Sequence, residues 1–284
     1  MTEVDRLLAW RRGDRPGPQR LHLVLTERCN LRCLSCHGGA ITPSRDEVPD
    51  ERLLAAVRQA IELGTEEIYL VDGEVLVRRA LTLRLMGAIK RAGLRGDLTT
   101  NGIGLDAATV RRIVGMGWDR LQVSLDGADP ATNDALRPPA GTFDAATAGL
   151  RRIQRRKRRV ASDLPRVTLT TVVTRHNVDQ MSALVDLAAD HAADEITFQS
   201  LKDMSPHCAE MHVPSAELPA LDTAAGEAQR RAAARGLLTN AGNFRQATVV
   251  DSIGRLDRVM RRDVHDLGDP VLGSHCFVPW TTLV

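Results

Sequence analysis

A regular alternation of short β-type runs with helical stretches constrains the fold more than any other feature. The runs are rich in Val, Ile, Leu and Thr, and they cover residues 21–26, 67–71, 97–100, 121–125, 167–173 and 195–198. Strands that alternate with helices form parallel sheets, because a helix must carry the chain back before the next parallel strand starts. We expect an α/β fold, a partial (β/α)6 TIM-like barrel, with functional residues at the carboxyl ends of its strands.

The helices between these runs carry recognisable ends. Residues 50–63 have apolar positions at helical spacing, and Gly64 follows where a helix would end. Asp106 is the expected cap of the helix that ends near residues 115–117. Asn177 and Gln180 form a capping-box pattern ahead of another helix.

Three segments are expected along the chain. Residues 1–20 form an N-terminal extension, residues 21–205 form the barrel core, and residues 206–284 form a C-terminal helical extension. The boundary follows a change in composition, because the strand–helix rhythm fades after about residue 202.

Charge and composition exclude several classes of protein. The 38 basic and 36 acidic residues leave a net charge of +2, and aromatic residues are 3% of the chain, which disfavours a general nucleic-acid surface. No uninterrupted apolar run suits a membrane span, and the N-terminus lacks a signal-peptide core, so we expect a cytoplasmic protein. The one basic run, residues 151–159, is typical of a solvated helix end, with RNA contact as the alternative.

Three of the five cysteines fall within eight residues. Cys29, Cys33 and Cys36 follow directly after the first β-type run. A clustered, odd set in a chain without a secretory signal indicates a metal site rather than disulfides. Thiolates suit zinc and iron–sulfur centres; a closed zinc site needs a fourth ligand, such as His37 or a distant residue. An iron cluster with three protein ligands instead leaves one iron open.

The C-x3-C-x2-C spacing after a first strand resembles the signature of the radical S-adenosylmethionine (radical SAM) superfamily. The resemblance implies a β/α barrel in which Cys29, Cys33 and Cys36 hold a 4Fe-4S cluster, with S-adenosyl-L-methionine (SAM) bound beside it. One departure is Ser35, since the residue before the third cysteine is usually aromatic in this family and packs on the adenine.

Similar motifs follow the next two β-type runs. The segment 72–76, Asp-Gly-Glu-Val-Leu, resembles the family's Gly-Gly-Glu-Pro motif, which implies that Gly73 and Glu74 bind the SAM amino group. The segment Thr99-Thr100-Asn101-Gly102 resembles another stretch of these enzymes, which makes Asn101 a candidate SAM contact. A turn with an exposed acid, and an ordinary Asn-Gly turn, are the alternatives.

The fourth run leads into a longer resemblance. Ser124-Leu125-Asp126-Gly127, a later Arg137 and Gly141-Thr142-Phe143 are similar to a stretch of radical SAM enzymes that carry a C-terminal SPASM or twitch domain. The resemblance implies that Ser124 and Asp126 lie near the ribose of SAM and that Arg137 pairs with its carboxylate. A solvated arginine and a turn aspartate are the alternatives.

The last two cysteines are less constrained. Cys276-Phe277-Val278-Pro279-Trp280 resembles the opening of a SPASM or twitch domain, so we expect a truncated or remnant domain with Cys276 as a candidate auxiliary-cluster ligand. A small buried thiol is the alternative. Cys208 follows the sixth run closely and is the candidate catalytic hydrogen-atom donor, with an ordinary loop cysteine as the alternative.

The resemblance implies reductive cleavage of SAM to a 5′-deoxyadenosyl radical, which abstracts a hydrogen atom from the substrate. A low-potential flavodoxin or ferredoxin would supply the electron. The SPASM-like ending favours a peptide precursor or a sugar-like natural-product intermediate, with oxidation, epimerisation or dehydration as the outcome. The alternatives are a radical SAM enzyme that modifies RNA and a non-catalytic zinc or iron–sulfur protein.

Overall fold

The chain folds around one open parallel sheet. The computed structural model describes residues 3–14, 16–36, 47–202, 206–245 and 282–283. All strand pairings are parallel, in the order β7-β6-β5-β4-β3-β2-β1-β8, and the two edge strands do not pair with each other. The strands are β1 (Arg20–Val24), β2 (Glu67–Val71), β3 (Arg95–Thr100), β4 (Arg120–Ser124), β5 (Arg166–Val173), β6 (Glu195–Ser200), β7 (Leu238–Thr239) and β8 (Thr282–Leu283).

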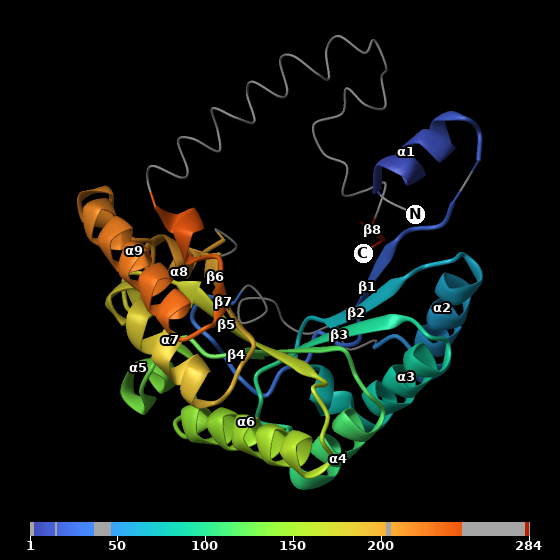
Figure 1. The fold of residues 1–284 in the computed structure, drawn as a ribbon, viewed down its shortest axis with the longest axis horizontal. Coiled ribbons are helices and arrows are strands. Elements are labelled where there is room, and N and C mark those ends of the chain that lie inside the picture. Colours follow the sequence, from blue (N-terminus) through green and yellow to red (C-terminus); the bar gives the residue numbers. More distant parts are fainter. Residues whose placement is uncertain (1–2, 15, 37–46, 203–205, 246–281, 284) are drawn as a thin grey trace.

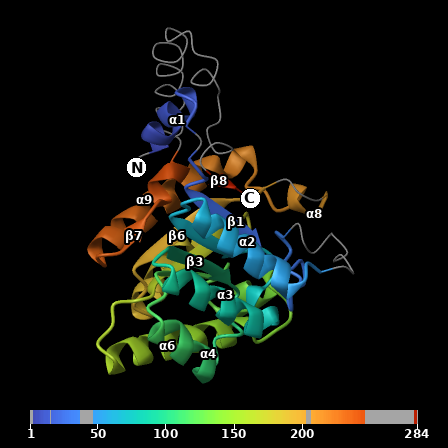
Figure 2. The same cartoon turned by 90° about the vertical axis from the view of Figure 1, so that its right-hand side faces the viewer.

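Helices cover the convex side of this curved sheet (Figure 1). Figure 2 shows α2 and α3 side by side over the first strands, in agreement with their direct packing. The helices are α1 (Glu3–Arg11), α2 (Asp50–Glu62), α3 (Arg79–Arg91), α4 (Ala107–Gly115), α5 (Pro130–Leu136), α6 (Thr142–Arg159), α7 (Met181–Asp190), α8 (Pro206–Ala209) and α9 (Leu218–Ala234). Short 3-10 turns are η2 (Val75–Arg78), η3 (Val178–Gln180), η4 (Ser215–Glu217) and η5 (Ala241–Phe244).

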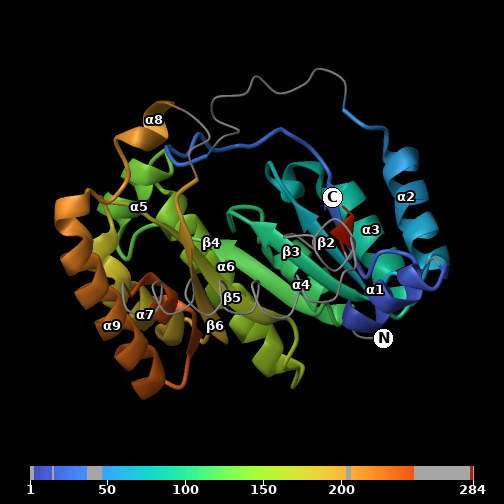
Figure 3. The ribbon, with the colours of Figure 1, turned by 90° about the horizontal axis from the view of Figure 1, so that it is seen from above.

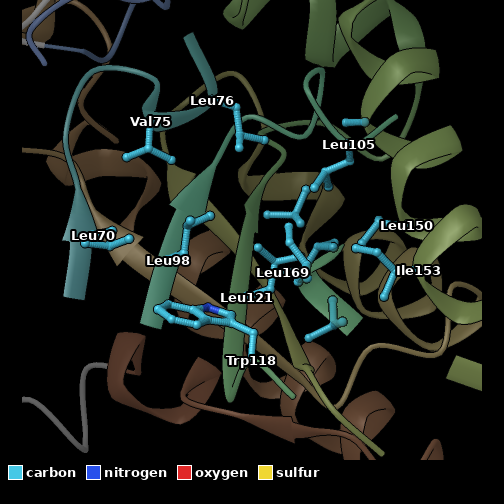
Figure 4. Packing of buried hydrophobic residues seen from close by; sticks show 14 of the residues in the cluster. Leu70, Val75, Leu76, Leu98, Leu105, Trp118, Leu121, Leu150, Ile153 and Leu169 are labelled. Carbon is cyan, nitrogen blue, oxygen red and sulfur yellow. The ribbon is translucent and has the colours of Figure 1, made fainter. Parts of the chain in front are cut away.

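The hydrophobic core lies between the sheet and these helices. Leu70, Leu98 and Leu121 occupy aligned positions on three neighbouring strands and are fully buried. Leu150 and Ile153 of α6 belong to the same cluster, and Figure 4 shows all five on one side of the sheet. Burial of each such side chain stabilises the folded state by roughly 1.5–3 kcal/mol relative to leaving it in water. The core therefore fixes which strand residues are left to face the concave side.

A glycine on β3 makes room for the largest buried side chain. Trp118 is fully buried beside this strand. A Cβ atom at Gly96 would lie 2.2 Å from the Trp118 ring, so only glycine leaves enough space at that position. The indole therefore closes the amino-terminal end of the core, opposite the end at which functional residues were expected.

The concave side of the sheet is polar. Between the core leucines, Tyr69, Thr99 and Gln122 point to the other face; the Tyr69 hydroxyl bonds to Thr99 Oγ1 at 2.5 Å. Gln122 Nε2 donates to Asp97 Oδ2 at 2.7 Å. Figure 3 shows the sheet as a curved wall with the helices outside it. This polar interior leads toward the carboxyl ends of the strands.

The structure confirms the expected partial barrel and adds detail. All six predicted strands are present, and β7 and β8 extend the sheet at its two edges. The predicted helix over 50–63 matches α2, and Asp106 caps α4 by accepting from Thr109 N at 2.8 Å. The sequence patterns did not indicate α1 or α5.

The capping box predicted from Asn177 and Gln180 is wrong. Neither side chain caps η3 or α7. Asn177 is buried and donates instead to the carbonyls of Asp126 and Val172 at 2.7 and 2.9 Å. The buried carbonyls of Asp126 and Val172 need a hydrogen-bond donor, and this long-range interaction replaces the local capping interaction.

The regions outside the predicted core also contact the barrel. Arg6 of α1 donates to Gly17 O at 2.6 Å and pairs with Glu66 at 2.7 Å. Helix α9 packs along α7, and β7 pairs with β6. The division of the chain at residue 205 stays a prediction. No helix in the described part of the chain is long and apolar enough to cross a membrane.

Candidate active site

One cavity lies at the carboxyl ends of the strands. Its volume is about 510 Å³. Each of the first six strands lends it a residue near its carboxyl end: Val24, Val71, Thr99, Ser124, Val172 and Gln199. Most of the residues that the sequence singled out also line it: Cys29, Cys33, Cys36, Gly73, Glu74, Asn101, Ser124 and Arg137. Motifs scattered over more than a hundred residues thus meet at one place.

The cysteine loop is held by the segment that contains Arg137. Leu34 N donates to Leu136 O at 2.9 Å, and Arg32 N donates to Pro138 O at 3.3 Å. Within the loop, Arg32 Nη1 donates to Cys29 O at 3.0 Å. The carbonyls on either side of Arg137 therefore fix the loop, so the thiols and the guanidinium keep a defined relative position.

The three thiols differ in exposure. Cys36 is exposed, whereas Cys29 and Cys33 are half-buried. Burial raises the pKa of the Cys29 thiol, and it raises the pKa of Cys33 to about 11, although the Arg137 charge opposes that rise. Desolvation therefore disfavours the thiolates unless a cationic centre lies against them. Three soft donors on one loop at one cavity suit an iron–sulfur cluster.

The described part of the chain offers no support for a zinc site. No three His, Cys, Asp or Glu side chains among those residues are arranged to hold a single metal ion. His37, the fourth ligand considered from the sequence, lies outside the described residues.

The turn after β2 is tightly built. Gly73 has a φ of +54°. A Cβ atom there would lie 2.4 Å from Thr26 O and 2.6 Å from Arg28 O. Asp72, which stands where the family motif has its first glycine, also adopts a positive φ, of 68°. Glycine at 73 thus lets the turn press against the start of the cysteine loop.

Glu74 is buried at the cavity wall and accepts three hydrogen bonds. Its Oε1 accepts from Leu76 N at 3.0 Å and from Thr100 Oγ1 at 2.7 Å, and its Oε2 accepts from Asn101 N at 2.7 Å. Burial raises the pKa of Glu74, while these hydrogen bonds oppose the rise. The carboxylate joins the ends of β2 and β3 and keeps accepting capacity on Oε2.

Asn101 connects the third strand to the cysteine loop. Its Nδ2 donates to Asn30 Oδ1 at 2.7 Å, and its Oδ1 accepts from Ile103 N at 3.0 Å. Asn30 lies directly after Cys29, so this amide contributes to the position of the first thiol as well as to the cavity wall.

Arg137 and Asp126 form a buried ion pair. Arg137 Nε donates to Asp126 Oδ2 at 2.7 Å, and its Nη1 lies 3.9 Å from Cys33 Sγ. Burial by itself lowers the pKa of the Arg137 guanidinium, but Asp126 and the Cys33 and Cys36 thiols together raise it above its ordinary value. Arg137 lines the cavity and Asp126 does not. The aspartate therefore lies behind the arginine and fixes its orientation.

Asparagines hold the aspartate in turn. Asn133 Oδ1 accepts from Asp126 N at 3.0 Å, Val172 N donates to Asp126 Oδ1 at 2.9 Å, and Asn177 donates to Asp126 O. Asn133 and Asn177 are fully buried. Sequence analysis placed neither residue at the site: it gave Asn133 no role and predicted Asn177 as a helix cap.

Cys208, like Asp126, is a predicted site residue that does not line the cavity. It is fully buried in α8. Cys276 lies outside the described residues. The cavity also includes polar residues that the sequence analysis did not single out. Among them are Gln199 and Ser200 at the end of β6 and Lys202 just after it.

The fold and the cavity define a class: an open parallel β/α barrel with three thiols, a buried acid and an arginine at its strand ends. Residues 23–188, more than half of the chain, match the model of the radical SAM superfamily. The chain belongs to the radical SAM superfamily.

The chain spans about half the length of the relatives that it matches. A PqqA peptide cyclase of Streptomyces rochei is 33% identical over 184 residues, which are 63% of this chain and 47% of that protein. The crystal structure of Streptococcus suis SuiB bound to S-adenosylmethionine has a TM-score of 0.67 at 17% identity, over 82% of this chain and 52% of SuiB. SuiB bound to its precursor peptide SuiA gives 0.66 at 18% identity, over 84% and 51%. The likeness to SuiB shows the fold alone.

Proposed function

We propose that the chain is the catalytic barrel of a radical SAM enzyme that modifies a peptide. The observation that carries the proposal is the meeting of three loop thiols, Glu74 and Arg137 at one cavity. When bound there, a 4Fe-4S cluster and SAM supply a 5′-deoxyadenosyl radical by one-electron cleavage of the sulfonium C–S bond. The protein holds the reactants and excludes water.

Cys29, Cys33 and Cys36 would be the three protein ligands of the cluster. Their shared loop, anchored through Leu34 and Arg32, presets the positions of the thiols before any metal binds. The raised pKa of Cys33 means that a metal must displace a proton to bind there, so loading would be favoured by higher pH.

The polar wall would bind the amino-acid part of SAM. Glu74 Oε2 and the turn at Gly73 would accept from the ammonium, while the Nη groups of Arg137 would donate to the carboxylate. Ser124 and Asn101, which line the same cavity, would face the remaining polar part of the ligand. Because Asp126 is covered by Arg137, we assign it a positioning role rather than a ribose contact.

A peptide substrate is supported by the names of two relatives. The Streptomyces rochei relative is called a PqqA peptide cyclase, and SuiB was solved with a precursor peptide. A low-potential flavodoxin or ferredoxin would deliver the electron, and a reducing compartment such as the cytoplasm would protect the clustered thiols. Oxidation, epimerisation and dehydration are the outcomes to distinguish by the mass of the product.

The test is anaerobic reconstitution with iron and sulfide, reduction, addition of SAM and measurement of 5′-deoxyadenosine. We expect about four irons bound at the site of Cys29, Cys33 and Cys36, together with formation of 5′-deoxyadenosine. Cys29→Ser should lose both, while Cys208→Ala, a matched cysteine away from the cavity, should keep its iron. A Cys29→Ser variant with full iron content and SAM cleavage would contradict the cluster assignment.

The peptide assignment needs its own test. Short open reading frames beside the gene would be synthesised as peptides and incubated with the reduced, SAM-loaded enzyme. A mass change in one peptide that depends on SAM and on Cys29 is the expected result. Robust SAM cleavage with no change in any such peptide would support the radical SAM activity and contradict the assignment of a peptide substrate.

A further inference from the structure

The end of β6 forms a part of the cavity that the cofactor assignment does not use. Ile196 and Phe198 are buried in the core, whereas Gln199 and Ser200 are exposed and line the cavity. Lys202 follows them and lines it too. The strand thus leaves the core just where it meets the cavity, with three polar residues at that point.

Lys202 differs from the other two lysines of the chain. Lys90 pairs with Asp119 at 2.6 Å, and Lys157 donates to Pro165 O at 2.9 Å. Both ammonium groups therefore secure loops of the fold. Lys202 is exposed and forms no hydrogen bond or ion pair with any residue that the structure describes. Its charge is available to a ligand.

The other cations at the cavity are already engaged. Arg32 donates through Nη1 to Cys29 O and Leu31 O, and Arg137 is paired with Asp126. Arg137 also lies against Cys33, on the thiol side. A second anionic ligand, bound beside the one that Arg137 takes, would find its cation at Lys202.

The acidic side chains of the cavity lie on different strands from Lys202. Glu27, Asp72 and Glu74 follow β1 and β2, whereas Lys202 follows β6. Four strands lie between β1 and β6 in the sheet. The acids repel a carboxylate on the β1–β2 side, where the Arg32 guanidinium is held by two carbonyls of its own loop. Lys202 attracts a carboxylate on the β6 side.

We propose that Lys202, assisted by Gln199 and Ser200, binds a carboxylate of the peptide substrate and thereby determines which peptides are held for reaction. This inference rests on the proposed function and names the chemistry of its substrate. An ammonium with three donors, flanked by an amide and a hydroxyl, suits a carboxylate. The carboxylate belongs either to an Asp or Glu side chain or to the end of a peptide.

The small number of lysines makes the test direct. Reductive ¹³C-methylation keeps the charge of lysine and gives at most three side-chain signals, read by NMR on the reconstituted, unreduced, SAM-saturated protein. Lys202→Arg identifies the Lys202 signal by its loss. Signals from Lys90 and Lys157, which are engaged elsewhere, serve as internal controls.

The probes are acetyl-Gly-Glu-Gly-amide, its Gln counterpart, and acetyl-Gly-Gly-Gly with a free carboxylate. We expect the Glu peptide to shift the Lys202 signal saturably, with half-saturation at a concentration about tenfold lower than for the Gln peptide. Tighter binding of the free-carboxylate peptide than of the Glu peptide would assign the site to a chain end, and weaker binding would assign it to an acidic side chain. No shift, or equal shifts from the Glu and Gln peptides, would overturn the proposal.

Failure of this inference is distinguishable from failure of the proposed function. SAM cleavage is therefore measured on the wild-type protein without a peptide, in the same preparation that is used for the peptide titrations. Normal cleavage with no carboxylate preference rejects the Lys202 site alone, whereas absent cleavage in the wild type rejects the proposed function.

Discussion

Arg137 lies between Asp126 and Cys33: its Nε donates to Asp126 Oδ2 at 2.7 Å, and its Nη1 is 3.9 Å from the Cys33 sulfur. The carbonyls of its two neighbours, Leu136 and Pro138, accept from the cysteine loop. One short segment after α5 therefore sets both the charge beside the thiols and the path of the loop that carries them.

Arg137→Lys tests this arrangement with the charge kept. Lysine cannot form the planar fork that holds Asp126 and a ligand carboxylate together, so we expect SAM affinity to fall about tenfold or more. Iron content should stay near that of the wild type, because the loop is held by backbone groups. Equilibrium dialysis of SAM and an iron assay are the measurements. Arg158→Lys, exposed on α6, is the control, and unchanged SAM binding in Arg137→Lys would refute the expectation.

Gly73→Ala should destabilise the protein much more than Gly64→Ala. Both glycines have a positive φ, but a Cβ atom at Gly73 would meet two backbone oxygens, whereas nothing lies within 4 Å of one at Gly64. We expect losses of about 2–4 kcal/mol against about 1 kcal/mol in unfolding free energy. Urea denaturation of the two variants measures the difference, and equal losses would show that the turn can move away from the cysteine loop.

Asp97 makes stability depend on pH. Burial raises its pKa from 3.8 to about 6. Between these values the folded protein holds a proton that the unfolded chain has lost, so this group lowers stability as pH rises from about 4 to about 6. Asp97→Asn removes that contribution, and its stability relative to wild type should rise by about 2–3 kcal/mol between pH 4 and pH 7.

The measurement for Asp97 is urea denaturation at both pH values. Asp179→Asn, an exposed change on η3, controls for the loss of one negative charge. If the two variants respond to pH alike, burial of Asp97 does not control its ionisation.

Cys208→Ala tests whether that thiol is a hydrogen-atom donor or only a buried structural side chain. Since Cys208 is fully buried in α8 and away from the cavity, we expect SAM cleavage and peptide modification at wild-type levels, with about 1 kcal/mol lost in stability. Retained SAM cleavage with loss of a deuterium-labelled epimerised product would restore Cys208 as the hydrogen-atom donor. Mass spectrometry in heavy water is the measurement.

Several elements followed from local sequence alone. The helical spacing over 50–63 predicted α2 to within one residue of its end, and Asp106 caps α4 as its position indicated. The cysteine spacing, placed after the first strand, was enough to expect three thiols at a strand end. Such features are encoded within one or two turns of helix or one strand, so a short window of residues contains the information.

Other features depended on partners far away in the chain. Asn177 looked like a helix cap, yet it serves the Asp126 and Val172 carbonyls. Asp126 looked like a ligand contact, yet Arg137 covers it. Lys202 carried no motif, and only its place in the cavity distinguishes it from Lys90 and Lys157.

The sequence by itself determined the parallel β/α order, the family and the three thiols, because periodicity and motif spacing are local properties. The tertiary structure alone decided which side chains reach the cavity and which lie behind it. The curvature of the sheet brings β1 and β6 to one cavity, and burial leaves each polar group in need of a specific partner, so both outcomes depend on contacts between residues distant in sequence.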